Sequence, residues 1–235
     1  MRRRKAAVLL CAALVLSACG NNAASEGTGT ATIPDPGRDF PIATTEGLEL
    51  EAKAWGTGTS YVVLAHMRPA DMTSWFEFAR LLADEGYTAV AFNFRGYGES
   101  EGEEGEFAVA DDVRGAVAAA LADGADEVFV IGASMGGTGA VAAAAGDGVA
   151  GTVTLSAPAE FEDVNATDFS PYVTGALLLI AADEDGEAAN DALAIASGNV
   201  DAELLVLPGA QHGTNLFAEH GIEITERILE FLTAG

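Results

Sequence analysis

Three residue types that cooperate in nucleophilic chemistry occur in order along the second half of the chain. Ser134 is the centre of the sequence GASMG, and a serine hydroxyl becomes a useful nucleophile only when a neighbouring base takes its proton. His212 can act as that base near neutral pH. The imidazole in turn needs a carboxylate to fix its tautomer, and Asp183 and Asp185 lie between the serine and the histidine. These residues predict acyl transfer through a covalent intermediate on Ser134.

The local sequence favours a sharp turn at Ser134. An apolar strand is expected before it, over Glu127–Ala133, and an Ala-rich helix after it, over Met135–Ala145. A serine at such a turn has a strained backbone, and small residues two positions away on either side avoid collisions. The pattern G-x-S-x-G can arise by chance in a glycine-rich chain, and the alternative is a turn before a packing helix. A dinucleotide-binding loop is excluded because G-x-G-x-x-G is absent here.

The chain has three histidines, and their positions distinguish them. His212 lies in the sequence PGAQHG, after the last predicted strand and before the last predicted helix. His220 falls inside that helix and is interpreted as a surface residue, whereas His66 ends an early strand. For the acid, Asp185 is preferred over Asp183, because the loop must leave the sheet edge before its carboxylate can turn toward His212. Asp183 stays open as the alternative.

Short apolar runs alternate with amphipathic or Ala-rich stretches, which predicts an α/β fold with a mostly parallel sheet. The expected strands are Leu48–Trp55, Ser60–His66, Thr88–Phe94, Glu127–Ala133, Gly148–Ser156, Ala176–Ala182 and Ala202–Leu207. The expected helices are Thr73–Glu85, Phe107–Ala122, Met135–Ala145, Glu187–Ser197 and Thr214–Leu232. In open sheets of this type ligands bind at the carboxyl ends of the strands, which is where Ser134, Asp185 and His212 are expected.

The N-terminal segment has the layout of an export signal. Basic residues at positions 2–5 precede an apolar run over Ala6–Leu16, which is too short to span a bilayer. The sequence LSAC at 16–19 resembles the lipobox of bacterial lipoproteins. This predicts a signal peptide over 1–18, lipidation of Cys19, a flexible tether over 19–39 and one folded domain over 40–235. An ordinary cleaved signal with Cys19 incidental is the alternative.

Composition limits the partners and cofactors. The chain has 36 Asp and Glu against 11 Lys and Arg, a formal net charge of −25, which disfavours nucleic acid and anionic lipid headgroups as electrostatic partners. Its two cysteines, Cys11 and Cys19, precede the expected domain, so that domain has no disulfide framework. Few and unclustered histidines argue against a metal site. We expect a monomer held at the membrane only by its lipid.

With these residues in view, the chain resembles the α/β-hydrolase superfamily over Leu48–Leu232, and more narrowly its small bacterial esterases and its members similar to dienelactone hydrolases or serine aminopeptidases. Residues 62–66 (VVLAH) look like the family's strand leading into an oxyanion loop. Residues 93–100 (NFRGYGES) are similar to its D-x-R-G-x-G-x-S segment. Residues 181–185 resemble its G-x-x-D acid motif, which selects Asp185. Met67 replaces a usual glycine, Asn93 replaces Asp, and dienelactone hydrolases proper carry cysteine rather than serine as nucleophile.

The resemblance implies a doubly wound sheet with helices on both faces, the chain order serine, acid, histidine, and no cofactor. By position the oxyanion donors would be the backbone N–H groups of Met135 and Arg68. The interval Ala157–Gly175 is too short for a cap domain, so short-chain esters are the expected substrates, cleaved outside the cell. Alternatives on the same residues are a peptidase, a thioesterase or a perhydrolase. A rival of another class is a non-catalytic lipoprotein that binds a ligand in the same cleft.

Overall fold

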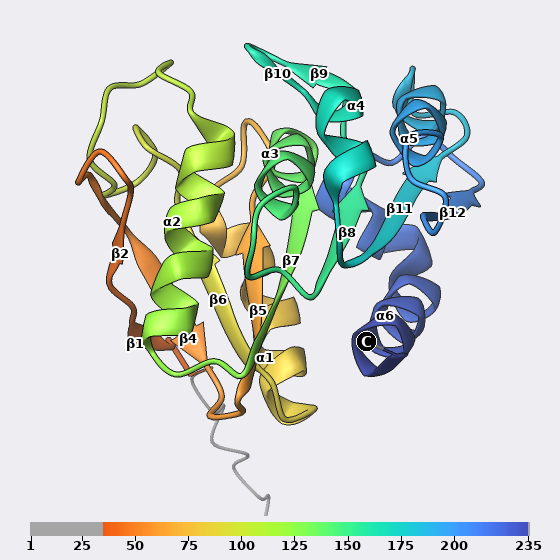
Figure 1. Cartoon of the computed structure of the whole chain (residues 1–235). Coiled ribbons are helices and arrows are strands. Elements are labelled where there is room, and N and C mark those ends of the chain that lie inside the picture. Colours follow the sequence, from red (N-terminus) through yellow and green to blue (C-terminus); the bar gives the residue numbers. More distant parts are fainter. Residues whose placement is uncertain (1–34, 235) are drawn as a thin grey trace, which may run out of the picture. The chain divides into compact units, whose positions relative to one another are not determined.

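The computed structural model describes residues 35–234 (Figure 1). The predicted signal peptide, Cys19 and all but the last residues of the predicted tether lie outside this range. The first strand, β1, is Arg38–Asp39, slightly before the expected start of the domain near Phe40. Asp35 also contacts the folded domain, because its backbone carbonyl oxygen accepts hydrogen bonds from Trp55 Nε1 at 3.1 Å and from Arg80 Nε at 2.9 Å.

The main sheet has eight strands in the order β1-β4-β6-β5-β7-β8-β11-β12. In this spatial order, every pair of neighbouring strands from β6 through β5, β7, β8 and β11 to β12 is parallel. Strand β4 runs antiparallel to both of its neighbours, β1 and β6. This confirms the predicted α/β architecture with a mostly parallel sheet. The remaining bounds are β4 Ala52–Trp55, β5 Ser60–Ala65, β6 Thr88–Phe92, β7 Glu127–Ala133, β8 Gly151–Leu155, β11 Ala176–Ala182 and β12 Glu203–Leu207.

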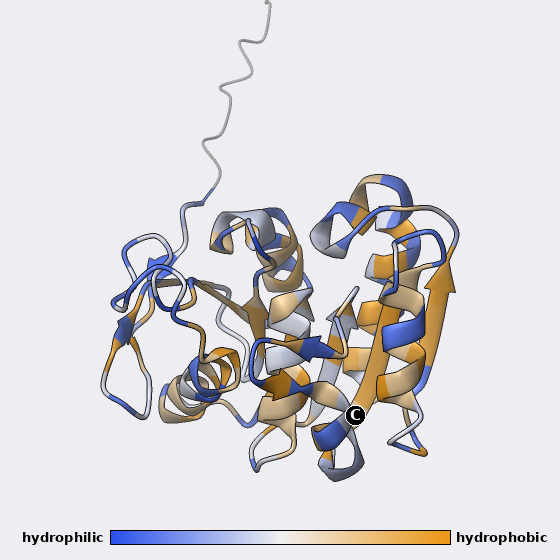
Figure 2. Cartoon of the chain, turned by 90° about the horizontal axis from the view of Figure 1, so that it is seen from above, coloured by the Kyte–Doolittle hydropathy of each residue, from blue (hydrophilic) through white to orange (hydrophobic). Residues whose placement is uncertain are grey.

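Helices cover both faces of the sheet (Figure 1). One face carries α2 (Val109–Ala122), α3 (Met135–Ala144) and α5 (Ala188–Ala196), and the other carries α1 (Phe76–Asp84) and α6 (Leu216–Ala234). Two separate apolar clusters result, because successive strand residues point to opposite faces. Buried parallel strands are therefore mostly apolar, as the orange strands of Figure 2 show.

The β11 strand illustrates the two-sided burial. Leu177 and Leu179 belong to the cluster under α2, α3 and α5, whereas Leu178 and Ile180 belong to the cluster under α1 and α6. All four side chains are at most 1% exposed. The continuous apolar sequence of β11 therefore places this strand in the interior. The loop at its carboxyl end contains Asp183, Glu184 and Asp185.

The amino-terminal part differs from the sequence expectation. The single strand expected over Leu48–Trp55 is divided into β3 (Glu49–Leu50) and β4, and β3 pairs with β2 (Ile42–Ala43) in a separate two-stranded ladder. Similarly, helix Thr73–Glu85 is a 3-10 helix, Met72–Trp75, followed by α1. Another 3-10 helix, Gly213–Asn215, precedes α6.

The interval Ala157–Gly175 contains no cap domain, in line with the prediction, but it holds more structure than a loop or one short helix. A hairpin of β9 (Glu160–Phe161) and β10 (Val164–Asn165) is followed by α4 (Ala166–Phe169) and a 3-10 turn. The hairpin loop has two residues, and Glu162 adopts φ 51°, as tight hairpin turns require.

Among the described residues, no helix is both long and apolar enough to cross a membrane.

Candidate active site at the carboxyl edge of the sheet

Ser134 lies at the turn between β7 and α3 with φ 49° and ψ −120°, a strained conformation for a residue with a side chain. The flanking glycines are required by close backbone contacts. A Cβ on Gly132 would lie 2.2 Å from the Gly136 carbonyl oxygen, and a Cβ on Gly136 would lie 2.4 Å from the Ala65 carbonyl oxygen. Only glycine fits at either position, and the turn exposes the half-buried serine at the sheet edge.

The structure brings Ser134, His212 and Asp185 together. His212 Nε2 lies 2.8 Å from Ser134 Oγ, and His212 Nδ1 lies 2.8 Å from Asp185 Oδ2 and 3.1 Å from Oδ1. Since an ionised carboxylate only accepts, Nδ1–H donates to Asp185 and leaves Nε2 free to accept the serine proton. The His212 side chain is 41% exposed and that of Asp185 is 13% exposed. Solvent and substrate can therefore reach the imidazole of His212, whereas the carboxylate that orients it is mostly buried.

Asp183 does not contact His212. It is exposed, and its Oδ1 accepts a hydrogen bond from the Gly209 amide at 2.9 Å. The Asp183 amide donates to the Leu207 carbonyl and the Glu184 amide to the Gly209 carbonyl. Asp183 therefore joins the loop that carries the acid to the loop that carries His212, and Asp185 is the carboxylate in position to orient the imidazole.

His220 is more constrained than a simple surface residue. Its side chain is 15% exposed, and its Nε2–H donates to the Pro208 carbonyl oxygen at 2.8 Å. Its backbone is non-helical, with φ −120°, where α6 bends. His220 thus connects the bent helix to the start of the loop that presents His212.

The two amides expected to hold an oxyanion have different surroundings. Met135 is the first residue of α3, so its N–H has no acceptor within the helix and lies at the positive end of the helix dipole. Arg68 lies in the loop after β5. Within residues 35–234, neither amide donates a hydrogen bond to the protein, so both are available to a ligand.

His66 supports the loop that carries Arg68. The ring is fully buried; Nε2 accepts from the Phe94 amide at 3.2 Å, and Nδ1–H donates to the Met67 carbonyl at 2.9 Å. Burial lowers the pKa of His66 to about 4, against the opposing effects of the Met67 carbonyl and of the Asp71 charge. The neutral ring matches its two hydrogen bonds, because one nitrogen donates and the other accepts.

A buried ion-pair network stabilises the neighbouring loop. The Arg95 side chain is 8% exposed and donates to Asp112 Oδ1 from Nε at 2.9 Å and from Nη2 at 2.7 Å, and to Glu46 from Nη1 at 2.7 Å. Burial raises the pKa of Asp112, and the hydrogen bonds and charge of Arg95 oppose that rise. Asn93 links the same loop to Met72 and Glu51 through hydrogen bonds of 2.8 and 2.7 Å.

The role of Asp112 was not predicted from the sequence, although the sequence contains a signal for it. Asp112 is a carboxylate among the buried residues of an Ala-rich helix, next to Val113 and one turn from Val109. A charge on such a face is costly unless it is paired. The buried position of Asp112 could therefore have predicted that a cation, here Arg95, pairs with it.

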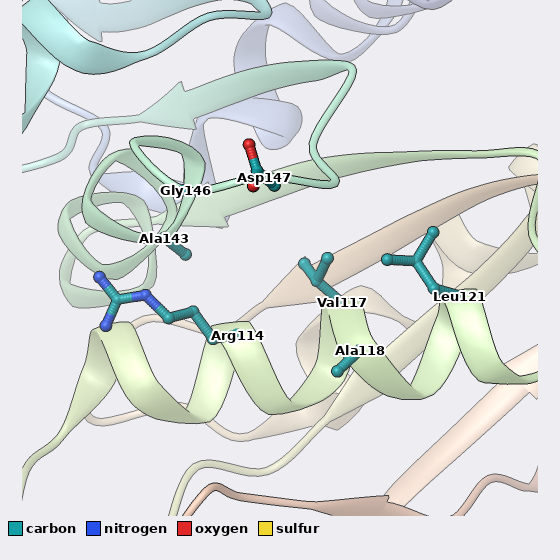
Figure 3. A pocket seen from close by; sticks show the side chains of 7 residues that line it. All are labelled: Arg114, Val117, Ala118, Leu121, Ala143, Gly146 and Asp147. Carbon is teal, nitrogen blue, oxygen red and sulfur yellow. The ribbon is translucent and has the colours of Figure 1, made fainter.

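One hollow of the described residues lies apart from this site. A hollow of about 210 Å³ between α2 and the end of α3 is lined by Val117, Leu121 and Asp147 among others (Figure 3), and none of the three site residues reaches it. Arg114 at its edge donates to the Ala142 carbonyl at 2.9 Å. No group of three or more His, Cys, Asp or Glu side chains in residues 35–234 is arranged to hold a metal ion.

A parallel sheet with a serine at a strained strand-to-helix turn, a histidine behind it and a carboxylate behind the histidine defines the α/β-hydrolase class. The family model described as alpha/beta hydrolase fold matches residues 61–215. The chain belongs to this family.

Several solved structures share the fold. An esterase from Pyrococcus furiosus is 20% identical, with a TM-score of 0.70 over 84% of this chain and 90% of that one. A thermophilic esterase from Thermogutta terrifontis is 21% identical, with a TM-score of 0.71 over 84% and 98%. The enol-lactonase from Burkholderia xenovorans is 17% identical, with a TM-score of 0.66 over 82% and 99%. No curated protein matches the sequence.

Proposed function

We propose that this protein is a serine hydrolase that cleaves small carboxylic esters through an acyl-enzyme on Ser134. The observation that carries the proposal is the unbroken hydrogen-bonded series from Ser134 Oγ through His212 to Asp185, with both links at 2.8 Å. A serine that only packs or only binds a ligand has no need of a base oriented by a carboxylate.

The reaction follows from that series. Ser134 Oγ attacks the ester carbonyl carbon while His212 Nε2 takes the hydroxyl proton, and Asp185 stabilises the imidazolium that forms. The carbon–oxygen bond to the alcohol then breaks, and His212 returns the proton to the departing oxygen. Water attacks the acyl-enzyme with His212 as base again, which releases the acid and restores the serine hydroxyl.

The negative charge on the tetrahedral oxygen is held by the amides of Met135 and Arg68 in this proposal. Both are free to donate, and Met135 adds the positive end of α3. Each oxyanion donor typically accelerates such reactions by roughly 100- to 1000-fold. No cofactor enters any step.

Ester cleavage is favoured over the other reactions of this triad by two considerations. The structural neighbours include proteins named as esterases and an enol-lactonase, and a lactone is an internal ester. The short segment between β8 and β11 forms a hairpin and short helices rather than a cap domain, so little apolar wall is available for a long acyl chain. A peptidase, thioesterase or perhydrolase would use the same residues.

The cellular location is also a proposal. The basic, apolar and small-residue segments before Cys19 support export, with Cys19 as the lipidated residue that anchors a monomer to the outer face of the cell membrane. The excess of acidic residues supports the absence of a nucleic-acid partner.

A substrate panel tests the proposed reaction. Purified protein is given p-nitrophenyl esters of increasing acyl length, matched thioesters and aminoacyl amides, and kcat/KM is measured for each. We expect the highest values on short esters, with a decline beyond roughly eight carbons because each further methylene stays in water. A preference for amides or thioesters, or for long chains above the micellar concentration, would show that the substrate assignment is wrong.

A further inference from the structure

Arg68 differs from the other basic side chains of the described residues. Four of the others donate to carboxylates, and two donate to backbone carbonyl oxygens. Within residues 35–234, only the Arg68 guanidinium donates no hydrogen bond and forms no ion pair. The six others are Arg38, Lys53, Arg80, Arg95, Arg114 and Arg227.

An unpaired cation is unexpected in this chain, where 36 acidic residues face 11 basic ones. The guanidinium of Arg68 is nevertheless held in place, because it lies over the Phe107 ring with 5.4 Å between its central carbon and the ring centroid. Phe107 packs in turn against Phe161 of β9, with centroids 5.2 Å apart. An arginine stacked on an aromatic face keeps its N–H groups directed outward in a plane that suits a carboxylate.

Arg68 lines a hollow of about 510 Å³ with Pro69, the turn Gly96–Gly98, Glu104, Gly105 and Phe107. Tyr97 also lines the hollow and packs on His66 with 4.8 Å between ring centroids, and its phenol is a second group that can donate a hydrogen bond. Burial raises the pKa of Tyr97, the charge of Arg68 lowers it and that of Glu104 raises it, so both charges lie close to the phenol. The hollow therefore combines a guanidinium, a protonated hydroxyl and one opposing carboxylate.

The hollow shares Arg68 with the proposed oxyanion site, although Ser134, Asp185 and His212 do not line it. The Arg68 amide is one of the proposed oxyanion donors, and its loop packs on the serine turn, since a Cβ on Gly136 would lie 2.7 Å from the His66 carbonyl oxygen. The arginine side chain extends only a few bonds beyond that amide. A negative group held there is separated from the cleaved bond by a short linker.

We propose that Arg68, assisted by the Tyr97 hydroxyl, is a specificity-determining residue that binds a carboxylate on the substrate, so that the preferred substrates are monoesters of short dicarboxylic acids. This depends on the proposed esterase function. Glu104 lines the same hollow, and within residues 35–234 it forms no ion pair with Arg68, so it weakens the subsite without neutralising it.

The test compares two esters of equal acyl length, the p-nitrophenyl monoester of glutaric acid and p-nitrophenyl pentanoate. The readout is the ratio of their kcat/KM values, because a ratio cancels general effects on catalysis. We expect the wild type to prefer the glutarate ester and Arg68→Gln to lower the ratio about tenfold, the lower range for a charge-assisted hydrogen bond at an exposed site. Arg68→Lys should lower the ratio less than Arg68→Gln does, because lysine keeps the positive charge. Glu104→Gln should raise the ratio. Arg80→Gln, an equal charge change on α1, is the matched control.

The outcomes separate this proposal from the proposed function. If both esters are hydrolysed with the same ratio by wild type and Arg68→Gln, the subsite is refuted while the esterase stands. A preference for an ester with a trimethylammonium group would also overturn it and assign the hollow to Glu104. If neither ester is cleaved, calorimetric titration of Ser134→Ala with monoethyl glutarate still decides: binding weakened by Arg68→Gln supports the subsite, and equal or absent binding refutes it.

Discussion

The carboxylate of Asp185 and the imidazole of His212 meet at 2.8 Å although 27 positions separate them in the chain. Each follows a strand of the sheet, β11 and β12, and these two strands are adjacent and parallel. Their carboxyl ends therefore present the two loops side by side. Asp183 fastens those loops together through the Gly209 amide rather than facing the imidazole.

This arrangement predicts unequal effects of two conservative substitutions. Asp185→Asn should lower kcat by roughly three to four orders of magnitude, because the amide no longer fixes the imidazole tautomer or stabilises the imidazolium. Asp183→Asn should stay within a few-fold of wild type, since its side-chain oxygen still accepts from Gly209. Steady-state kinetics on a short ester decides, and a crippled Asp183→Asn beside an active Asp185→Asn would overturn the assignment of the acid.

Buried, neutral His66 predicts a dependence of stability on pH. Its pKa is about 4 in the folded protein, against 6.5 for an ordinary histidine, so the unfolded chain binds more protons between these values. The stability that His66 contributes is complete above pH 6.5 and falls as the pH is lowered toward 4, by roughly 3 kcal/mol.

Urea unfolding of wild type and His66→Gln at several pH values tests this. Glutamine can donate to Met67 and accept from Phe94 without titrating, so the difference between the proteins isolates the histidine from the carboxylates. We expect wild type to lose stability relative to the variant from pH 6.5 to 4. Parallel pH profiles would mean that His66 is not held neutral.

The Arg95–Asp112 pair predicts a large cost for removing the buried carboxylate. Asp112→Asn should reduce the free energy of unfolding by about 3 kcal/mol, because it leaves a desolvated guanidinium with weaker partners. Asp111→Asn is the matched control on the same helix: its more exposed carboxylate is 3.3 Å from Arg95, and its loss should cost at most about 1 kcal/mol. Equal effects in chemical denaturation would contradict the buried-pair account.

Anchoring through Cys19 predicts a change of cell fraction. The Cys19→Ser protein should appear in the soluble fraction or remain unprocessed, because the acyl chains that would hold it to the membrane cannot be attached. Cys11→Ser, altered within the predicted signal peptide, should fractionate like wild type. The anchor would be refuted if Cys19→Ser were as firmly membrane-bound as the parent protein.

The fold class could be predicted from the sequence because a parallel strand that is buried on both faces has a continuous apolar sequence, as β11 does. Ser134, Asp185 and His212 were expected at the sheet edge because each follows a strand, and the structure brings their side chains together. The hairpin of β9 and β10, the hydrogen bond from Gly209 to Asp183 and the partners of Arg95 were not predicted. The hydrogen bond from Gly209 and the partners of Arg95 depend on contacts between distant segments, which local periodicity does not encode. The hairpin is local, but its strands have two residues each, too few to show an alternating pattern.

The most direct test of the central claim is labelling by a fluorophosphonate, since only a base-activated serine attacks phosphorus at a useful rate. Wild type should be labelled once, at Ser134, as located by mass spectrometry of the digested protein. Labelling should vanish in Ser134→Ala, fall strongly in His212→Ala and persist in the control Ser197→Ala, whose serine is exposed at the end of α5. Labelling that survives Ser134→Ala, or its absence from folded wild-type protein, would contradict the assignment of Ser134 as the nucleophile.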